Sequence, residues 1–316
     1  MKYDKTILVT GGMGFIGSNF LNTYVLKYKN YFFINIDSLV EGSNVENILV
    51  NKASNYHFEK IDIRNKEILE KVFIEFNITD IIHFAAQSNV DDSIKNPTLF
   101  IETNINGTNN LLELALKYKI NRFYQISTDE VFGSLEKNEK PFTTNSNLSP
   151  NNPYSASKAG AELLARSYNK TFGLNTIISR CSNNFGPNQR LQSLIPKFIT
   201  YLIEGKKIPV YGNGENIRDW IYVFDHIEAV DLLFHKGISG SVYNIGANNE
   251  ISNKDIVKIL LKITNRDESY IENAPDRLGH DFRYAIDTSE LFKDFGWKAK
   301  TNFEDGIKKT FEFYKK

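Results

Sequence analysis

A hydroxyl and two adjacent carboxyl groups, Thr128, Asp129 and Glu130, follow an apolar segment at residues 123–126. The alternating bulky residues predict a buried strand, and Gly133 marks the point where the chain turns away. Open α/β sheets bind their ligands at the carboxyl ends of strands, so these side chains are placed for chemistry. Two neighbouring acids can act as general acid and general base when their surroundings separate their pKa values. An isolated Asp-Glu pair is more commonly a solvated turn, so the interpretation depends on the rest of the chain.

A glycine-rich segment follows the first predicted strand, residues 6–10. Its spacing is GxxGxxG, with Gly11 suited to a tight turn, Gly14 to close approach of a pyrophosphate, and Gly17 to close packing of the next helix. A helix expected over about residues 18–26 directs its positive end at the phosphates. Glycine motifs arise by chance, but this one lies between a strand and a helix. The context therefore predicts a dinucleotide site.

Asp37 ends the second predicted strand, residues 32–37, and lies 20 residues beyond Gly17. A carboxylate at this distance is typical of a hydrogen bond to the adenosine ribose. An acid with no arginine beside it would repel a 2′-phosphate. The sequence therefore favours NAD over NADP as the cofactor.

Further alternation of strands and helices defines the fold class. Strands are expected at residues 56–61 and 80–86, and helical patterns at 66–76 and 97–118. This order predicts an α/β protein with a Rossmann-like doubly wound parallel sheet. The strand ends join the glycine loop in the predicted cofactor site, which comprises Gly11, Gly14, Phe15, Ile16, Gly17, Asp37, Asp62, Ile63, Ala85, Ala86, Tyr154 and Lys158. Within the fourth strand, His83 is interpreted as a packed core histidine.

Tyr154 and Lys158 open a further predicted helix, after Asn152 and Pro153, which suit a cap and a first turn. Residues four apart share one helical face. A neighbouring ammonium and a positive nicotinamide would both favour the phenolate of the tyrosine, which otherwise has a pKa near 10. The lysine can also bond the nicotinamide ribose. Tyr-x-x-x-Lys alone is common by chance, but it occurs here with the glycine loop and the Thr128 hydroxyl.

Composition excludes several classes of function. Lys+Arg and Asp+Glu are both 38, so the formal net charge is zero and gives no support for nucleic-acid binding. Cys181 is the single cysteine, and the five histidines show no metal-ligand spacing, so we expect no metal. No apolar run approaches the roughly 20 residues of a membrane span. The first residues carry no signal-peptide pattern. These features predict a soluble cytoplasmic protein.

Taken together, these motifs resemble the extended short-chain dehydrogenase/reductase superfamily and, within it, the nucleoside-diphosphate-glucose 4,6-dehydratases. The resemblance runs nearly end to end and rests on segments 11–17, 127–133, 154–158, 183–187, 218–220 and 279–287. The adjacent acids after Thr128 are the most discriminating part, because related epimerases and decarboxylases lack them. The resemblance implies an NAD-dependent enzyme that converts dTDP-glucose or UDP-glucose to a 4-keto-6-deoxy sugar with loss of water.

The same resemblance assigns roles to individual residues. Tyr154, assisted by Thr128, would take the proton from the sugar O4, with Lys158 beside it. Glu130 would remove the C5 proton, and Asp129, kept protonated, would donate to the departing O6 hydroxyl. A smaller α/β lobe would hold the nucleotide sugar, and the implied substrate-binding residues are Ser88, Asn183, Arg218, Asn253, Arg277 and His280. For each arginine taken alone, a surface ion pair would be the simpler interpretation.

Domain boundaries and assembly also follow as expectations. Residues 1–182 plus about 217–246 are expected to form the NAD-binding domain, and about 183–216 plus 247–316 the nucleotide-sugar-binding lobe. By resemblance the protein would be a homodimer, paired through helices near residues 97–118 and 153–172. The partner expected at the active site is a nucleotide sugar.

Two departures from the family pattern leave the substrate open. The segment 87–93 reads QSNVDDS where the dTDP-glucose enzymes often have ESHVDRS, and Leu278 replaces a usual proline. Both lie near the expected pocket, so the nucleobase, the choice between glucose and N-acetylglucosamine, and inversion at C5 stay open. A UDP-N-acetylglucosamine 4,6-dehydratase and a nucleotide-sugar 4-epimerase are the alternative enzymes. A binding protein that holds NAD without turnover would have no use for Asp129 and Glu130.

Overall fold

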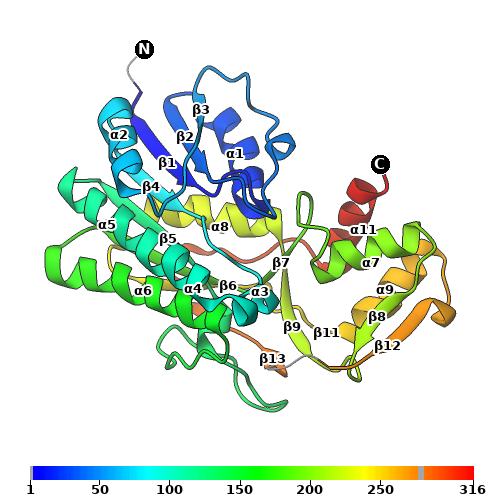
Figure 1. Ribbon diagram of the computed structural model, residues 1–316. Coiled ribbons are helices and arrows are strands. Elements are labelled where there is room, and N and C mark those ends of the chain that lie inside the picture. The colour runs from blue at the N-terminus through cyan, green and yellow to red at the C-terminus, as the bar shows by residue number, and fades with distance from the viewer. Residues whose placement is uncertain (1–2, 277–280) are drawn as a thin grey trace.

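A seven-stranded parallel sheet organises the computed structural model, which describes residues 3–276 and 281–316 (Figure 1). The predictions for Arg277 and His280 lie outside the described residues. The strand order is β10-β6-β5-β4-β1-β2-β3, so the order reverses between β1 and β4. This confirms the Rossmann-like doubly wound sheet, whose ligands bind where the order reverses. The strands are β1 (Lys5–Thr10), β2 (Tyr31–Asp37), β3 (Tyr56–Lys60), β4 (Asp80–His83), β5 (Arg122–Thr128), β6 (Thr176–Cys181) and β10 (Val242–Ile245).

Helices cover both faces of this sheet because successive side chains of a strand point to opposite faces. Ile7 and Val9 belong to a core with α1 (Phe15–Lys27) and α8 (Val223–Lys236). Between them in sequence, Leu8 packs into the opposite core. That core includes apolar residues of α2 (Lys66–Phe76), α5 (Thr108–Lys117) and α6 (Pro153–Phe172).

A second, smaller lobe lies beside the carboxyl ends of the main sheet (Figure 1). It has its own apolar core, separate from the two cores of the main sheet. Its sheet joins β11, β9 and β13, with β7 also paired to β9, and a two-stranded sheet joins β8 and β12. The strands are β7 (Asn183–Phe185), β8 (Ile208–Tyr211), β9 (Ile217–Tyr222), β11 (Glu250–Ser252), β12 (Ile271–Ala274) and β13 (Arg283–Tyr284), and the helices are α7 (Leu194–Ile203), α9 (Asn253–Thr264) and α11 (Phe303–Tyr314).

The expected boundary near residue 217 assigned β9 to the NAD-binding domain, but its strand partners lie in the smaller lobe. It is hydrogen-bonded to β7, β11 and β13, whereas α8 packs on α1 and β10 pairs with β6. Backbone pairing therefore groups residues 217–222 with the smaller lobe, whereas α8, by packing, and β10, by pairing, belong with the main sheet. The division of the chain into two domains stays a prediction. Helix α10 (Ser289–Phe295) contacts β10, so the chain returns to the main sheet near its end.

The helical pattern expected over residues 97–118 is not one regular α-helix. It consists of α4 (Pro97–Phe100), a π-helical segment η2 (Ile101–Gly107) and α5, and it is preceded by α3 (Val90–Lys95). The wider π turn directs Asn104 at the chain after β4, where its amide bonds both N–H and C=O of Gln87. Short 3₁₀ helices are η1 (Val45–Asn47), η3 (Asp129–Phe132) and η4 (Glu268–Tyr270).

His83 is a packed core residue, as predicted. Its Nδ1 lies 2.6 Å from Thr10 Oγ1, and its Nε2 lies 3.0 Å from Thr108 Oγ1. Burial lowers its pKa to about 3, so the ring is neutral. Within the described ranges, 3–276 and 281–316, no helix combines the length and apolarity that a membrane crossing requires.

Candidate active site

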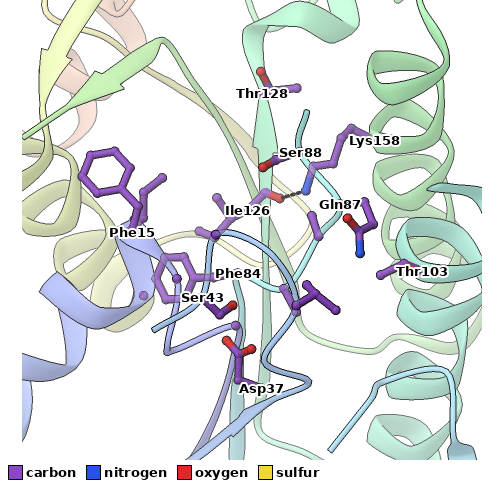
Figure 2. Close-up of a pocket in the computed structure, with 18 of the residues that line it drawn as sticks. Phe15, Asp37, Ser43, Phe84, Gln87, Ser88, Thr103, Ile126, Thr128 and Lys158 are labelled. Atoms are coloured by element: carbon purple, nitrogen blue, oxygen red, sulfur yellow. Dashed lines mark hydrogen bonds between the residues drawn. The ribbon is translucent and has the colours of Figure 1, made fainter. Parts of the chain in front are cut away.

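A single cleft of about 390 Å³ crosses the carboxyl ends of β1, β2, β4 and β5 and receives the predicted catalytic and cofactor residues. Figure 2 shows Asp37 at one end and Thr128 at the other, with Ile126 and Lys158 between them. The cleft is lined by all of the predicted residues of both groups: Gly11, Gly14, Phe15, Ile16, Gly17, Asp37, Asp62, Ile63, Ala85, Ala86, Thr128, Asp129, Glu130, Tyr154 and Lys158. Residues from six separate segments of the chain thus meet in one place.

The glycine loop has the shape that a dinucleotide requires. A Cβ on Gly11, whose φ is +71°, would lie 2.6 Å from Ala85 N, and one on Gly17 would lie 2.4 Å from Gly11 O. These two positions are closed by the protein's own backbone. A Cβ on Gly14 would meet only Gly11 O, at 3.3 Å, so the space over Gly14 opens into the cleft. Because α1 has no side-chain cap and no acid in its first turn, its N–H groups stay available to a phosphate.

Asp37 is held rigidly at the adenosine end. Its two carboxylate oxygens accept hydrogen bonds from Met13 N (3.0 Å) and Leu39 N (2.8 Å), and it is 5% exposed. A carboxylate oxygen has more than one lone pair, so it can still accept from a ribose hydroxyl. The position and orientation therefore fit the role that the sequence predicts.

Asp62 is the second acid at this end, and it is already paired. Arg64 donates to it from its backbone N and from Nε and Nη2 of its guanidinium, at 2.7–3.1 Å. Although partial burial raises the pKa of Asp62, these hydrogen bonds outweigh it and the pKa is lowered. Beside it, Ile63 is buried, and Ala85 N donates to Thr10 Oγ1 at the start of the next loop. The small side chains after β4 leave the backbone accessible.

The catalytic turn begins inside a strand. β5 continues through Thr128, two residues further than the apolar pattern indicated, and η3 starts at once with Asp129. Thr128 Oγ1 accepts from Glu130 N at 3.3 Å and donates to Asp129 Oδ1 at 3.3 Å. The other oxygen, Asp129 Oδ2, is buried and has no partner among the described residues. The turn thus presents one carboxyl group that is incompletely hydrogen-bonded.

The pKa values of both acids are raised. For Asp129 the pKa lies well above its usual range, first because of burial and then because of the charges of Glu130 and Asp219. Burial raises the pKa of Glu130 to about 7, opposed by Arg218 and by a hydrogen bond from Asn152, while Asp281 adds to the increase. At neutral pH Asp129 is the group that keeps its proton, and Glu130 is the group that can lose one.

Tyr154 and Lys158 reach the cleft from the first turns of α6. Asn152 caps this helix by accepting from Ser155 N at 2.9 Å, and Pro153 occupies its first turn, as predicted. Lys158 Nζ donates to Ile126 O at 2.7 Å (Figure 2). Burial lowers the pKa of Lys158 to about 8. The lysine is therefore tied to the strand that carries the catalytic turn.

The sequence predicted that Lys158 and a bound nicotinamide would together favour the phenolate of Tyr154, and in the protein alone the pKa of the phenol is raised. Burial raises its pKa well above 10, the negative charge of Glu130 adds to this, and a hydrogen bond with Thr128 opposes it. Lys158 is turned to the carbonyl of Ile126, so its ammonium is not the phenol's partner. In the protein alone Tyr154 is a neutral phenol, and a positive charge in the cleft is needed to favour the phenolate.

A second hollow of about 240 Å³ adjoins the cleft, and Glu130 and Asn183 line both. Arg218 and Asn253 also line it, so these predicted substrate residues come together although they lie in β7, β9 and α9. The side-chain oxygens of Asn183 and Asn253 are buried without partners among the described residues, which fits groups that await a ligand. Ser88, by contrast, lines the larger cleft beside Gln87.

Arg218 is less free than the sequence suggested. Its guanidinium donates to the backbone carbonyls of Ile217, Asp281 and Phe282 and stacks on Tyr284. With five N–H donors, it keeps capacity for a ligand. Three residues of this hollow were not predicted from the sequence: Asn152, Trp220 and Asp281. Asn152 stood at a predicted helix cap, and the other two lie inside segments on which the resemblance rests.

Comparison with known proteins agrees with this geometry. The family model described as GDP-mannose 4,6 dehydratase matches residues 8–310. The low-salt glycan biosynthesis protein Agl12 of Haloferax volcanii is 43% identical over 309 residues, 98% of each chain. The dTDP-glucose 4,6-dehydratase of Salmonella typhimurium is 41% identical over 98% of this chain and 92% of its own. The crystal structure of a Bacillus anthracis dTDP-glucose 4,6-dehydratase in complex with NAD is 44% identical, with a TM-score of 0.92 over 98% of this chain and 96% of that one. The chain belongs to the GDP-mannose 4,6 dehydratase family.

Proposed function

We propose that this protein is an NAD-dependent nucleotide-sugar 4,6-dehydratase that converts dTDP-glucose or UDP-glucose to the 4-keto-6-deoxy sugar and water. The observation that carries the proposal is the pair Asp129 and Glu130, which share one cleft with Tyr154 and have pKa values raised to different extents. An epimerisation at C4 needs a single proton acceptor. Elimination of water also needs an acid and a base that act on neighbouring carbons.

The cofactor fits the residues that line the cleft. Gly14 and the first turn of α1 would hold its pyrophosphate, Asp37 its adenosine ribose, and Lys158 its nicotinamide ribose. When bound, NAD supplies reversible hydride acceptance at the nicotinamide and a positive charge on that ring. The residues predicted from the sequence to bind it all line this cleft.

Tyr154 and Thr128 would act on the hydroxyl at C4 of the sugar. Both residues line the same cleft, and Thr128 opposes the rise in the pKa of the phenol. Since the phenol is neutral in the protein alone, its function as a base depends on the positive charge brought into the cleft. Proton removal from O4 is therefore expected only when the cofactor and the sugar are both bound.

Glu130 and Asp129 would carry out the elimination. Glu130, with a pKa of about 7, would take the proton from C5, which a ketone at C4 makes acidic. Asp129, which keeps its proton, would donate it to the departing hydroxyl at C6. One water would leave. Return to C6 of the hydride taken from C4, with a proton to C5, would then give the 4-keto-6-deoxy sugar, so the conversion would consume no net oxidant.

Asn183, Arg218 and Asn253 would hold the diphosphate and nucleoside of the substrate from the smaller lobe, and Ser88 would contact the sugar. Support comes from the buried amide oxygens of Asn183 and Asn253, which have no partner among the described residues, and from Arg218, which lines the second hollow. Arg277 and His280 keep the substrate roles implied by the resemblance. They lie outside the described residues.

The proposal also includes a cytoplasmic homodimer. Ile101, Leu163 and Phe172, on η2 and α6, are 49%, 51% and 54% exposed. Pairing of these helices between two copies would cover them. Leu163→Asp should shift the mass measured by light scattering to that of a monomer, and an unchanged dimer mass would exclude this surface.

Product identification tests the proposal. The purified protein is incubated separately with dTDP-glucose, UDP-glucose and UDP-N-acetylglucosamine, and the products are analysed by mass spectrometry and NMR. A product lighter by one water, with a ketone at C4, is expected. A product of unchanged mass with C4 inverted would identify a nucleotide-sugar 4-epimerase, an activity named for solved structures of the same fold, such as the UDP-glucose 4-epimerase of Thermotoga maritima (30% identity, TM-score 0.91).

A further inference from the structure

Arg190 lies at the mouth of the cofactor cleft without a role in the mechanism above. Its side chain is 19% exposed and lines the cleft that also contains the glycine loop. Its Nη2 lies 3.3 Å from Glu41 Oε1, on the loop after β2, and its Cδ would touch a Cβ placed on Gly42. Its Nε is buried and has no hydrogen-bond partner within residues 3–276 and 281–316. A buried N–H of a charged group without a partner is costly, which indicates a ligand.

The loop that carries Arg190 is fastened to the start of α1. Asn19 Nδ2 donates to Pro187 O at 2.9 Å, and Asn188 Nδ2 lies 3.2 Å from Ser18 Oγ. Both contacts involve the first turns of α1, whose N-terminus has no side-chain cap and whose first residues line the cleft. The guanidinium is therefore held close to the position where the helix presents its positive end.

Among the cationic side chains of this cleft, Arg190 also has the weakest contacts with other groups of the protein. Two other cationic side chains line the cleft within the described part of the chain, Arg64 and Lys158. Arg64 makes a two-pronged pair with Asp62, and the lysine donates to the carbonyl of Ile126. Glu41, the partner of Arg190, is 69% exposed, and such a surface ion pair contributes little to stability.

We propose that Arg190 binds the diphosphate of the dinucleotide, exchanging its ion pair with Glu41 for the phosphate oxygens. The inference rests on the proposed function for the identity of this ligand. A diphosphate could also come from the nucleotide sugar. The cofactor is favoured because Arg190 lines the larger cleft with Gly14 and Phe15 and does not line the second hollow, whereas its neighbours Gln189 and Ser193 line both.

The test measures binding rather than turnover. NAD-depleted protein is titrated calorimetrically with ADP-ribose and, separately, with dTDP. Arg190→Gln is expected to weaken ADP-ribose binding about 10-fold, as loss of one charge-assisted contact predicts, and to leave dTDP binding within about 2-fold. Arg190→Lys should recover part of the affinity, because the charge remains. The ADP-ribose affinity of the wild type should fall with salt more steeply than that of Arg190→Gln.

Two further variants distinguish a direct contact with the ligand from a purely structural role of the Arg190–Glu41 pair. Glu41→Gln removes the resting partner and should bind ADP-ribose at least as tightly as the wild type. Lys300→Gln removes an exposed cation paired with Glu228, outside both hollows, and should change neither affinity. Unchanged ADP-ribose binding in Arg190→Gln would overturn the proposal, as would an equal loss in Glu41→Gln or a loss confined to dTDP. Since ADP-ribose binding needs no sugar chemistry, failure of the dehydratase assay would be a separate result.

Discussion

The cleft contains two pairs of carboxyl groups whose surroundings differ sharply. At the adenosine end, Asp37 accepts two backbone N–H groups and Asp62 is paired with Arg64. At the catalytic end, Asp129 has a buried oxygen without a partner among the described residues, and burial raises the pKa of Glu130 to about 7. Hydrogen bonds to a carboxylate stabilise its charge, whereas burial without them destabilises it. The first pair is fixed by hydrogen bonds and suited to hold a ligand, and the second is suited to exchange protons.

Removal of the base at the catalytic end should have the largest effect. Glu130→Gln is expected to lower kcat for dehydration about 1,000-fold, since a positioned general base contributes 100- to 10,000-fold. Incorporation of solvent deuterium at C5, followed by NMR, should disappear. Affinity for dTDP should be retained, because the shape of the side chain is preserved. Undiminished exchange at C5 would remove Glu130 from the role of base and make the two ends of the cleft equivalent.

Removal of the acid should have the next largest effect. Asp129→Asn keeps the volume and the neutral state of the native side chain, so its melting temperature at pH 7 should lie close to that of the wild type. Its kcat should fall about 100-fold or more, because the amide cannot protonate the departing hydroxyl. Exchange at C5 should survive in this variant, which distinguishes it from Glu130→Gln. A large loss of stability would instead indicate that Asp129 is charged in the native state.

The pH dependence of stability should identify Glu130 directly. Its folded pKa of about 7 exceeds its ordinary value of 4.5, so the native state retains a proton that the unfolded state has lost. Stability should therefore fall as pH rises from about 4.5 to about 7, by up to about 3 kcal/mol. The difference between the wild type and Glu130→Gln, from urea unfolding at each pH, isolates this contribution. Parallel curves for the two proteins would mean that Glu130 titrates normally.

The adenosine end should respond least. Arg64→Gln breaks a pair whose arginine side chain is 40% exposed, and such pairs contribute about 0–1 kcal/mol. NAD affinity, measured by calorimetry, should change less than about 5-fold, with kcat nearly unchanged. Lys66→Gln, on the neighbouring exposed pair with Glu113, is the matched control. A loss of kcat comparable to that of Asp129→Asn would show that the adenosine end also takes part in proton transfer.

Local sequence patterns predicted much of the fold and of the site. A strand that runs into glycine, an asparagine cap followed by proline, and a tyrosine and lysine four apart each depend on neighbours a few residues away. Such signals predicted α2 at Lys66–Phe76, the alternation of strands and helices along the chain, and the predicted residues that line the cleft. The segment around Ile101 was harder, because a π turn and an α-helix share nearly the same apolar spacing.

By itself, the sequence determined which chemical groups are present and which strand ends carry them. Only the tertiary structure decided their protonation and their partners: the neutral phenol of Tyr154, the carbonyls that occupy Arg218, and the pairing that places β9 in the smaller lobe. Burial and charge act through space, between residues that lie far apart along the chain. The same acid can therefore be a fixed ligand at Asp37 or a proton donor at Asp129, and the fold determines which.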